Sequence, residues 1–264
     1  MTELVRGLWV VAYRDILGFV SDRFRIFASL TFPLLFLLIF GGGFSNVIGR
    51  MAGGVDIVQF MYPGIIAQAV LTTSLFAGVS IVSDREVGFL REILVAPLSR
   101  TGIVLGKAAG SATVALVQVL FLLVIAPIVD VPLDLETVLL LVPTVVVLSL
   151  VLSGLGILIG SFARSQQGFQ LFMQMLVFPM IFLAGVFFPV DQVPLWMEVA
   201  SKVNPVTYGV DAIRQVFLGS GIAGAGLGVT VFGHTMSFVE EVALVSVLGI
   251  VLMAAATWAF GRQE

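Results

Sequence analysis

Six stretches of the chain carry no charged residue and are long enough to cross a lipid bilayer as a helix. They comprise residues 26–49, 57–83, 108–129, 137–163, 165–190 and 242–261. A helix rises about 1.5 Å per residue, so about 20 apolar residues span the hydrocarbon core of a membrane. The pattern predicts an all-α integral membrane protein with six transmembrane helices, over about residues 26–46, 58–83, 106–128, 137–162, 166–188 and 241–261.

The polar connections between these stretches are short. Six spans use nearly all of the 264 residues, and only 11% of the residues are charged, against about 25% in soluble domains. We therefore expect one transmembrane domain over 26–262, preceded by a segment over 1–25, with no separate soluble domain. No A-x-A cleavage pattern closely follows the first span, so we expect it to be retained rather than removed as a signal peptide.

Positively charged residues gather in the connections on one side of the predicted membrane. Ten of the 13 lysines and arginines fall on the side of both termini. Because positive charge is retained in the cytoplasm, we expect a multi-pass protein of the cell membrane with cytoplasmic N and C termini. The uncharged stretch 215–238 contains six glycines and is interpreted as an extracellular loop rather than a seventh span, with a partial dip into the membrane left open.

Residues 1–25 have the pattern of an amphipathic helix. A polar stripe includes Arg14 and Arg25, and Trp9 and Tyr13 lie beside an apolar stripe. Aromatic side chains suit the headgroup level of a bilayer, and arginines suit anionic lipid. We expect a helix along the cytoplasmic surface, with the ordinary flank of a signal anchor as the alternative.

The connection 84–107 is the most charge-dense part of the chain and also predicts a short amphipathic helix. An apolar side includes Val87, Leu90 and Leu94, and Pro97 ends the helix. A stop-transfer loop needs charges but no apolar side, so the pattern indicates a partner surface. Ser99 or Thr101 is expected to cap the next helix.

The outer connection 187–238 predicts two short helices, over 193–202 and 205–218. Neither is long enough to cross the membrane, so we expect both to rest in or on its outer surface.

Residue patterns for catalysis are missing. The single histidine, His234, lies in a polar loop, and the acidic residues 130, 134 and 136 are interpreted as a solvated turn rather than a metal site. The phosphate-binding loop G-x-x-x-x-G-K-[ST] is not present, because Lys107 is followed by Ala108. We expect no catalytic residue, metal or cofactor on this chain, and no nucleic-acid binding. The apolar spans carry no charge at mid-membrane depth, which disfavours a proton-driven carrier.

Glutamines share one face of the fifth stretch. A possible substrate path is formed there by Gln167, Gln170, Gln174 and Phe178. Hydrogen bonds between helices are an equally good explanation of these glutamines. Two G-x-x-x-G pairs, Gly106 with Gly110 and Gly156 with Gly160, would allow close approach of helices.

Three segments together resemble a known family: the amphipathic start, the connection 86–107 and the sequence NPVTYGVDAIR at 204–214. The chain resembles, over about residues 5–262, the membrane permease subunits of type-2 ABC exporters. These export subunits include the daunorubicin-resistance, O-antigen and nodulation-factor classes.

The resemblance implies a coupling helix that docks on a separate ATP-binding subunit, which would hold ATP and Mg²⁺. Leu90 and Leu94 would insert into a groove of that subunit, and charged residues would orient the contact. The implied contact residues are Glu86, Val87, Gly88, Leu90, Arg91, Glu92, Leu94 and Pro97. A second membrane subunit, identical or different, would complete the path within the membrane lipid.

In the outer segment, the resemblance implies an extracellular motif that fixes the short helices or is purely structural. It comprises Asn204, Pro205, Tyr208, Asp211 and Arg214. The implied function is ATP-driven export of a hydrophobic or amphipathic molecule, such as a drug, a lipid or a lipid-linked glycan. An ATP-independent secondary transporter or channel is the main alternative, and a scaffold subunit is a third.

Overall fold

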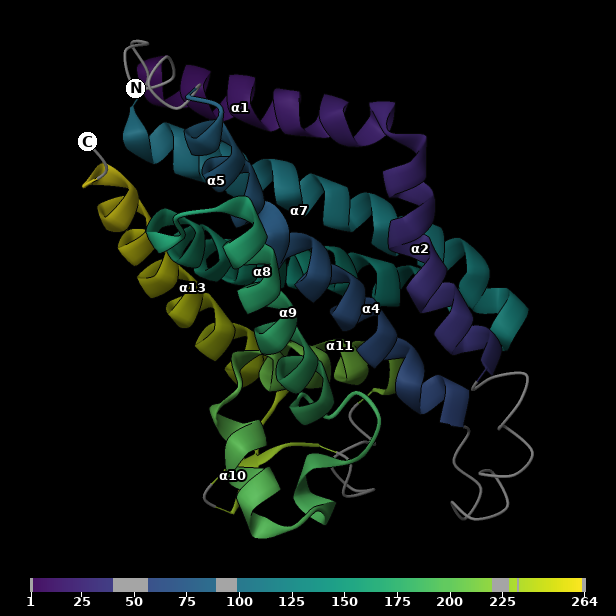
Figure 1. Cartoon of the computed structure of the whole chain (residues 1–264). Helices are drawn as coiled ribbons and strands as arrows, with labels where there is room; N and C mark the ends of the chain where they lie inside the picture. Colours follow the sequence, from purple (N-terminus) through teal and green to yellow (C-terminus); the bar gives the residue numbers. More distant parts are fainter. Residues whose placement is uncertain (1, 40–56, 89–98, 220–227, 232, 263–264) are drawn as a thin grey trace.

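A computed structural model describes residues 2–39, 57–88, 99–219, 228–231 and 233–262. These residues are almost entirely helical (Figure 1), and their only sheet is the small antiparallel pair of β1 and β2. The elements, in order, are α1 (Thr2–Ser21), α2 (Arg23–Leu37), α4 (Ile57–Leu75), η2 (Phe76–Gly78), α5 (Val79–Glu86), α7 (Arg100–Ile125), η3 (Ala126–Val129), α8 (Leu135–Phe162), α9 (Gln166–Leu183), η4 (Val190–Gln192), α10 (Leu195–Val203), α11 (Pro205–Leu218), β1 (Thr230–Val231), β2 (His234–Thr235) and α13 (Phe238–Gly261).

Four of the described helices are long and apolar enough to cross a membrane. They are Val58–Glu86, which joins α4, η2 and α5, then Arg100–Val129, Leu135–Phe162 and Phe238–Gly261. These agree with four of the six expected spans. The first expected span extends into residues that the structure does not describe, and its described apolar part is Ile26–Leu37. The fifth forms α9, whose apolar run is diluted by four glutamines. The six-span topology therefore stays a prediction.

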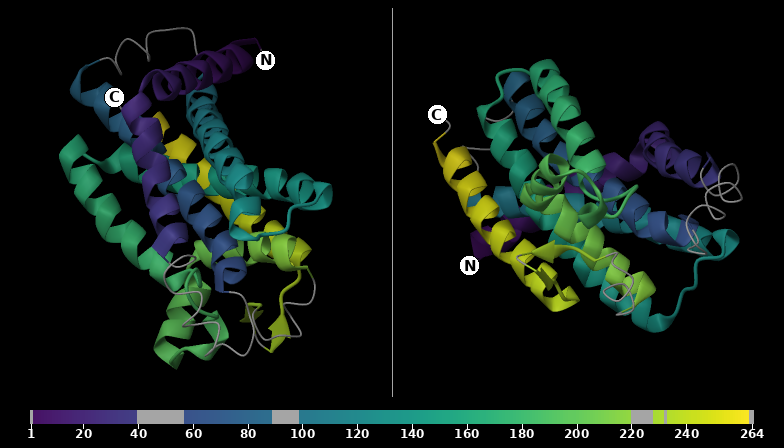
Figure 2. Two further views of the ribbon diagram at one scale, coloured as in Figure 1. Left: turned by 90° about the vertical axis from the view of Figure 1, so that its right-hand side faces the viewer. Right: turned by 90° about the horizontal axis from the view of Figure 1, so that it is seen from below.

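The long helices form a bundle. α1 lies across one end of the bundle, close to the end of α13, and the short helix α10 lies at the other end (Figures 1 and 2). We call these the α1 end and the α10 end. The two short outer helices expected from the sequence are formed, as α10 and α11.

Side-chain caps define where several helices begin. Ser99 accepts a hydrogen bond from Gly102 N at 3.1 Å at the start of α7, which selects Ser99 over Thr101 as the cap. Asp134 caps α8 and Ser165 caps α9 in the same way. Each cap satisfies a backbone N–H that has no partner within its helix.

Glycines allow two pairs of helices to approach closely. A Cβ atom on Gly160 of α8 would lie 2.8 Å from the carbonyl oxygen of Gly78, and one on Gly156 would be closer still to the backbone of Leu75. On α7, a Cβ atom on Gly106 would lie 2.8 Å from the carbonyl oxygen of Leu8 in α1. Both predicted G-x-x-x-G pairs thus lie at helix contacts, as expected for membrane helices packed without large side chains between them.

We expect Gly156→Ala to destabilise the protein by about 1–3 kcal/mol, since the added methyl group meets backbone atoms that cannot rotate away. The measurement is thermal unfolding of the purified protein in mild detergent. Gly18→Ala is the matched control, because a Cβ atom there has nothing within 4 Å. Equal unfolding midpoints for the two variants would contradict the close α4–α8 packing.

Candidate functional site: a charged junction and an adjoining cavity

The last turn of α5 carries three charged residues in succession, and the first of them joins α1 to α7. Asp84 accepts hydrogen bonds through Oδ2 from Arg14 Nη2 of α1 at 3.1 Å and from Lys107 Nζ of α7 at 3.3 Å. Only 1% of the Lys107 side chain is exposed, and its ammonium also donates to Ser80 at 2.6 Å. A buried ammonium is tolerated when it is paired and hydrogen-bonded, so Asp84 fixes α1 and α7 to α5.

The other two charged residues hold the connection between α8 and α9. Arg85 donates to the carbonyl oxygens of Ser161 at 3.0 Å and Ala163 at 2.6 Å, at the end of α8. Glu86 accepts through Oε1 from the backbone N–H of Gln166 at 3.0 Å, at the start of α9. These side chains bond to backbone groups that have no partner at a helix end. The positive charge lies at the end of α8 and the negative charge at the start of α9, which are the signs that the helix dipoles favour. We call residues 84–86 the charged junction.

α1 packs on α7 through one face, bonds to α5 through Arg14 and turns an apolar face outward. Trp9 and Tyr13 stack on the outward face with ring centroids 6.2 Å apart. The exposed apolar side chains of α1 and the start of α2 include Val5, Trp9, Tyr13, Leu17, Val20 and Phe24. Arg14, which belongs to the predicted polar stripe, donates a hydrogen bond to Asp84 of α5.

Three of the eight residues predicted to contact an ATP-binding partner are described by the structure. Glu86 belongs to the charged junction, and Val87 is 79% exposed. Gly88 has a φ of 81°, which glycine adopts without strain, so the chain leaves the axis of α5 there. The other five lie outside the described residues: Leu90, Arg91, Glu92, Leu94 and Pro97.

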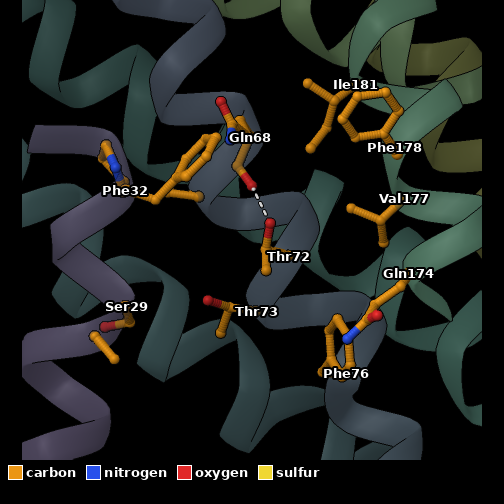
Figure 3. A pocket seen from close by; sticks show the side chains of 13 residues that line it. Ser29, Phe32, Gln68, Thr72, Thr73, Phe76, Gln174, Val177, Phe178 and Ile181 are labelled. Carbon is orange, nitrogen blue, oxygen red and sulfur yellow. Dashed lines mark hydrogen bonds between the residues drawn. The ribbon is translucent and has the colours of Figure 1, made fainter. Parts of the chain in front are cut away.

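A cavity of about 460 Å³ lies between α2, α4 and α9 (Figure 3). Among the residues that the structure describes, its lining contains no charged side chain, and it includes the rings of Phe32, Phe76 and Phe178. Gln68 also lines it and is only 4% exposed, and among the described residues its Oε1 has no hydrogen-bond partner. We call this the first cavity.

The predicted path residues divide between the first cavity and the surface of α9. Gln174 and Phe178 line the cavity and project toward it from α9 in Figure 3. Gln167 and Gln170 are exposed and belong to another part of α9. Half of the predicted set therefore comes together at one place.

At the α10 end, the predicted outer motif builds the start of α11. Asn204 accepts from Val206 N at 3.1 Å and donates to the carbonyl oxygen of Met180 at 2.7 Å, which ties α11 to α9. Pro205 occupies the first position of α11, where its missing N–H costs nothing. Tyr208 donates to the carbonyl oxygen of Lys202 at 2.7 Å.

The neighbouring Lys202 forms ion pairs with Glu198 at 2.5 Å and Asp191 at 3.0 Å. Burial opposes its charge, but these two carboxylates raise the pKa of Lys202 above its ordinary value. The ammonium therefore stays charged at neutral pH and joins α10 to η4.

Arg214 and Asp211 lie in a buried polar cluster between α4, α11 and α13. Arg214 donates to the carbonyl oxygen of Gly185 at 2.6 Å and lies 3.5 Å from Asp211, with its guanidinium 4.2 Å from the ring centre of Phe60. Arg214 and Asp211 are at most 1% exposed. The contacts make Arg214 the central cation of the cluster.

Sequence reasoning missed two members of this cluster. Gln215 donates to Glu241 at 3.0 Å and to Asp211 at 3.3 Å. Glu241 is fully buried, although it precedes the apolar stretch 242–261 and looks like an ordinary flanking charge. The sequence shows only that Glu241 directly precedes that stretch, and this position does not indicate a partner on α11.

Comparisons with known proteins all point to one family of transport proteins. The family model described as ABC-2 type transporter matches residues 6–218. Nodulation protein J of Rhizobium leguminosarum bv. trifolii is 29% identical over 217 residues, covering 80% of this chain and 81% of the relative. The putative transport permease ycf38 of Cyanophora paradoxa is 27% identical over 218 residues, covering 81% of this chain and 74% of the relative.

A shorter match is to the probable multidrug ABC transporter permease YbhR of Escherichia coli (strain K12). It is 32% identical over 168 residues, which cover 62% of this chain and 45% of the relative. The matched relatives are thus named as transport permeases or as a nodulation protein.

We expect Arg214→Met to destabilise the protein by about 3–5 kcal/mol, because it leaves the buried carboxylate of Asp211 without its cation. Thermal unfolding in mild detergent measures the loss. Lys202→Met is the control: Lys202 also pairs with two carboxylates, but its side chain is 23% exposed, and such pairs contribute about 0–1 kcal/mol. A smaller loss for Arg214→Met than for Lys202→Met would refute the central role of Arg214.

Proposed function

The chain belongs to the ABC-2 type transporter family, and we propose that it is the membrane permease subunit of an ATP-driven exporter. Two membrane subunits, identical or different, would form the translocation path, and a separate ATP-binding subunit would hold ATP and Mg²⁺ and perform hydrolysis. We propose no catalytic role for any residue of this chain. Its sequence has no phosphate-binding loop of the G-x-x-x-x-G-K-[ST] kind.

The charged junction is the observation that carries this proposal. Residues 86–97 are proposed to contact the ATP-binding subunit, and the junction lies directly at the start of that segment. Through Asp84, Arg85 and Glu86, the end of α5 is bonded to α1, α7, α8 and α9. A displacement of the contact segment would therefore reach four helices at once, as expected where a nucleotide-driven movement enters a membrane domain.

The arrangement in the membrane follows the positive-inside rule. We propose six spans within a domain over 26–262, cytoplasmic termini, and a cytoplasmic α1 end. The segment 1–25 would lie along the inner membrane surface, since the outward face of α1 is apolar and carries Trp9 and Tyr13. The α10 end, with the motif from Asn204 to Arg214, would face outside.

The first cavity supports a hydrophobic or amphipathic substrate. Its volume of about 460 Å³ lies in the range of about 300–1,000 Å³ found for pockets that enclose drug-sized ligands. Uncharged walls with aromatic rings favour an apolar molecule, and Gln68 and Gln174 supply hydrogen-bonding groups. We propose that this cavity lines one side of the path.

Purification of tagged chain from mild-detergent membrane extract, followed by an ATPase assay, tests the proposal. We expect a soluble protein carrying G-x-x-x-x-G-K-[ST] to co-purify and to show vanadate-sensitive hydrolysis. The variant Leu90→Asp with Leu94→Asp should lose this subunit, whereas Leu135→Asp, an exposed leucine far along the chain, should retain it. A chain that purifies alone and without ATPase activity in several detergents would favour the ATP-independent transporter or channel.

We expect Arg85→Ala to uncouple hydrolysis from transport. The variant frees the last carbonyl groups of α8 from their cationic partner, so movement of the contact segment no longer reaches α8. Substrate-stimulated ATPase activity in proteoliposomes should fall by about tenfold, the change for a loss of about 1.4 kcal/mol, while the ATP-binding subunit stays bound.

Arg164→Ala is the matched control for this measurement. Arg164 is an exposed cation in the same α8–α9 connection and lies one residue after Ala163, the acceptor of Arg85. Equal stimulation in the two variants would show that the charged junction does not transmit the movement.

A further inference from the structure

A second cavity of about 350 Å³ lies between α1, α5 and α7, next to the charged junction. Thr73 and Phe76 line both this second cavity and the first cavity. The same two residues are labelled on the wall of the first cavity in Figure 3. The two cavities therefore share part of their walls, at the end of α4 and the start of η2.

The two cavities differ in chemistry. Among the described residues, the first has no charged side chain in its lining. The lining of the second is mixed: beside apolar side chains such as Phe76, Val79 and Val114, it contains hydroxyl and charged groups, which are Thr73, Ser80, Ser83, Ser111, Arg14, Asp15 and Lys107. Such a change from apolar to polar across a shared wall fits a ligand with an apolar body and a polar head.

The charges around the second cavity balance. Arg14 pairs with Asp84 at 3.1 Å and Asp15 at 3.6 Å, and Lys107 pairs with Asp84 at 3.3 Å. Among the described residues, the lining carries two cations and one carboxylate, and Asp84, which lies behind the lining, supplies the second carboxylate. Together these four groups leave no net charge to attract a charged head group. A head group with a net charge would also lie near a like charge, which is unfavourable at such short range. The cavity therefore suits an uncharged or zwitterionic head that forms hydrogen bonds.

Gln68 gives a further requirement in the first cavity. Its side chain is 4% exposed, and among the described residues its Oε1 has no partner. A buried amide oxygen without a hydrogen bond is unfavourable, so a donor on the ligand would remove that cost. The apolar body is thus expected to carry one hydrogen-bond donor, such as an amide N–H.

We propose that the two cavities form one binding site for an amphipathic molecule with a net-neutral polar head and an apolar body that carries a hydrogen-bond donor. The head lies in the second cavity and the body in the first, with Thr73 and Phe76 at the boundary. This inference rests on the proposed function and names the class of its substrate. With the α1 end cytoplasmic, the head lies near the inner surface and the body deeper, which is the orientation of a molecule in the inner leaflet.

Photolabelling of the purified chain in nanodiscs, with any co-purifying subunits and without nucleotide, tests this site. The probe is an amide-linked alkyl diazirine with a phosphocholine head; two analogues carry a phosphate or a trimethylammonium head. Peptide mapping should find saturable phosphocholine-probe labelling within 68–76 and 174–181, about tenfold stronger than with either charged analogue. Equal labelling by all three probes, or labelling that does not saturate, would overturn the proposal.

Two filling variants test whether the cavities act as one site. Ser83→Leu occupies the second cavity and Ser29→Leu the first. Each should weaken labelling of both peptide regions about tenfold. Ser246→Leu is the control, since Ser246 bonds to a carbonyl of its own helix as Ser29 does and lines neither cavity. Unchanged labelling of 174–181 in Ser83→Leu, with wild-type thermal stability, would show that the cavities are separate.

Gln68→Leu provides a variant of similar volume that keeps both cavities open. It should weaken the amide probe about tenfold but leave an analogue with a methylene group in place of the amide unchanged. An equal effect on both probes would exclude the assigned role of Gln68. Because these measurements need no ATP hydrolysis, absence of labelling together with an ATPase subunit that co-purifies rejects this site and leaves the proposed function intact.

Discussion

The α1 end depends on the pairing of charged side chains with one another and with the ends of helices. The ammonium of Lys107 is buried away from water, so it must be paired within the protein. Asp84 serves the cations of α1 and α7, Arg85 serves the last carbonyls of α8, and Glu86 serves the first N–H of α9. Because these residues are consecutive, a shift of the last turn of α5 strains all of these contacts together.

Close helix contacts make that junction rigid. Gly102, Gly106 and Gly110 bring α7 onto the backbone of α1, and Gly156 and Gly160 bring α8 onto α4 and η2. Packed backbones resist small deformation and move instead between discrete arrangements. The cluster of Arg214, Asp211 and Glu241 holds α11 and α13 together at the other end, so the described helices are fixed by buried charge at both ends.

The features that the sequence predicted are those set by nearby residues. Four spans, the two short helices α10 and α11, the cap at Ser99 and the glycine pairs follow from periodicity, proline, hydroxyl and glycine positions. The pairing of Lys107 with Asp84 was not predicted, because its 23-residue separation gives no local signal. Glu241 was missed for the same reason, since its partner Gln215 lies on another helix. Two of the four expected path residues, Gln174 and Phe178, line the first cavity, because Gln167 and Gln170 lie nearer the start of α9, beyond the cavity.

The charged junction bonds through Asp84 to Lys107 and Arg14, which also line the second cavity, and this has a consequence for transport. A ligand influences a conformational equilibrium only as far as it binds one state better than the other. A polar head that bonds to Ser80 acts on the group that holds the Lys107 ammonium, and movement of α5 acts on the same ammonium through Asp84. Occupancy of the cavity and movement of the contact segment would thus change the same ion pairs. If bound substrate favours one position of the contact segment, then by linkage that position also strengthens substrate binding. Substrate-dependent hydrolysis therefore needs no further signalling element between the cavity and the ATP-binding subunit.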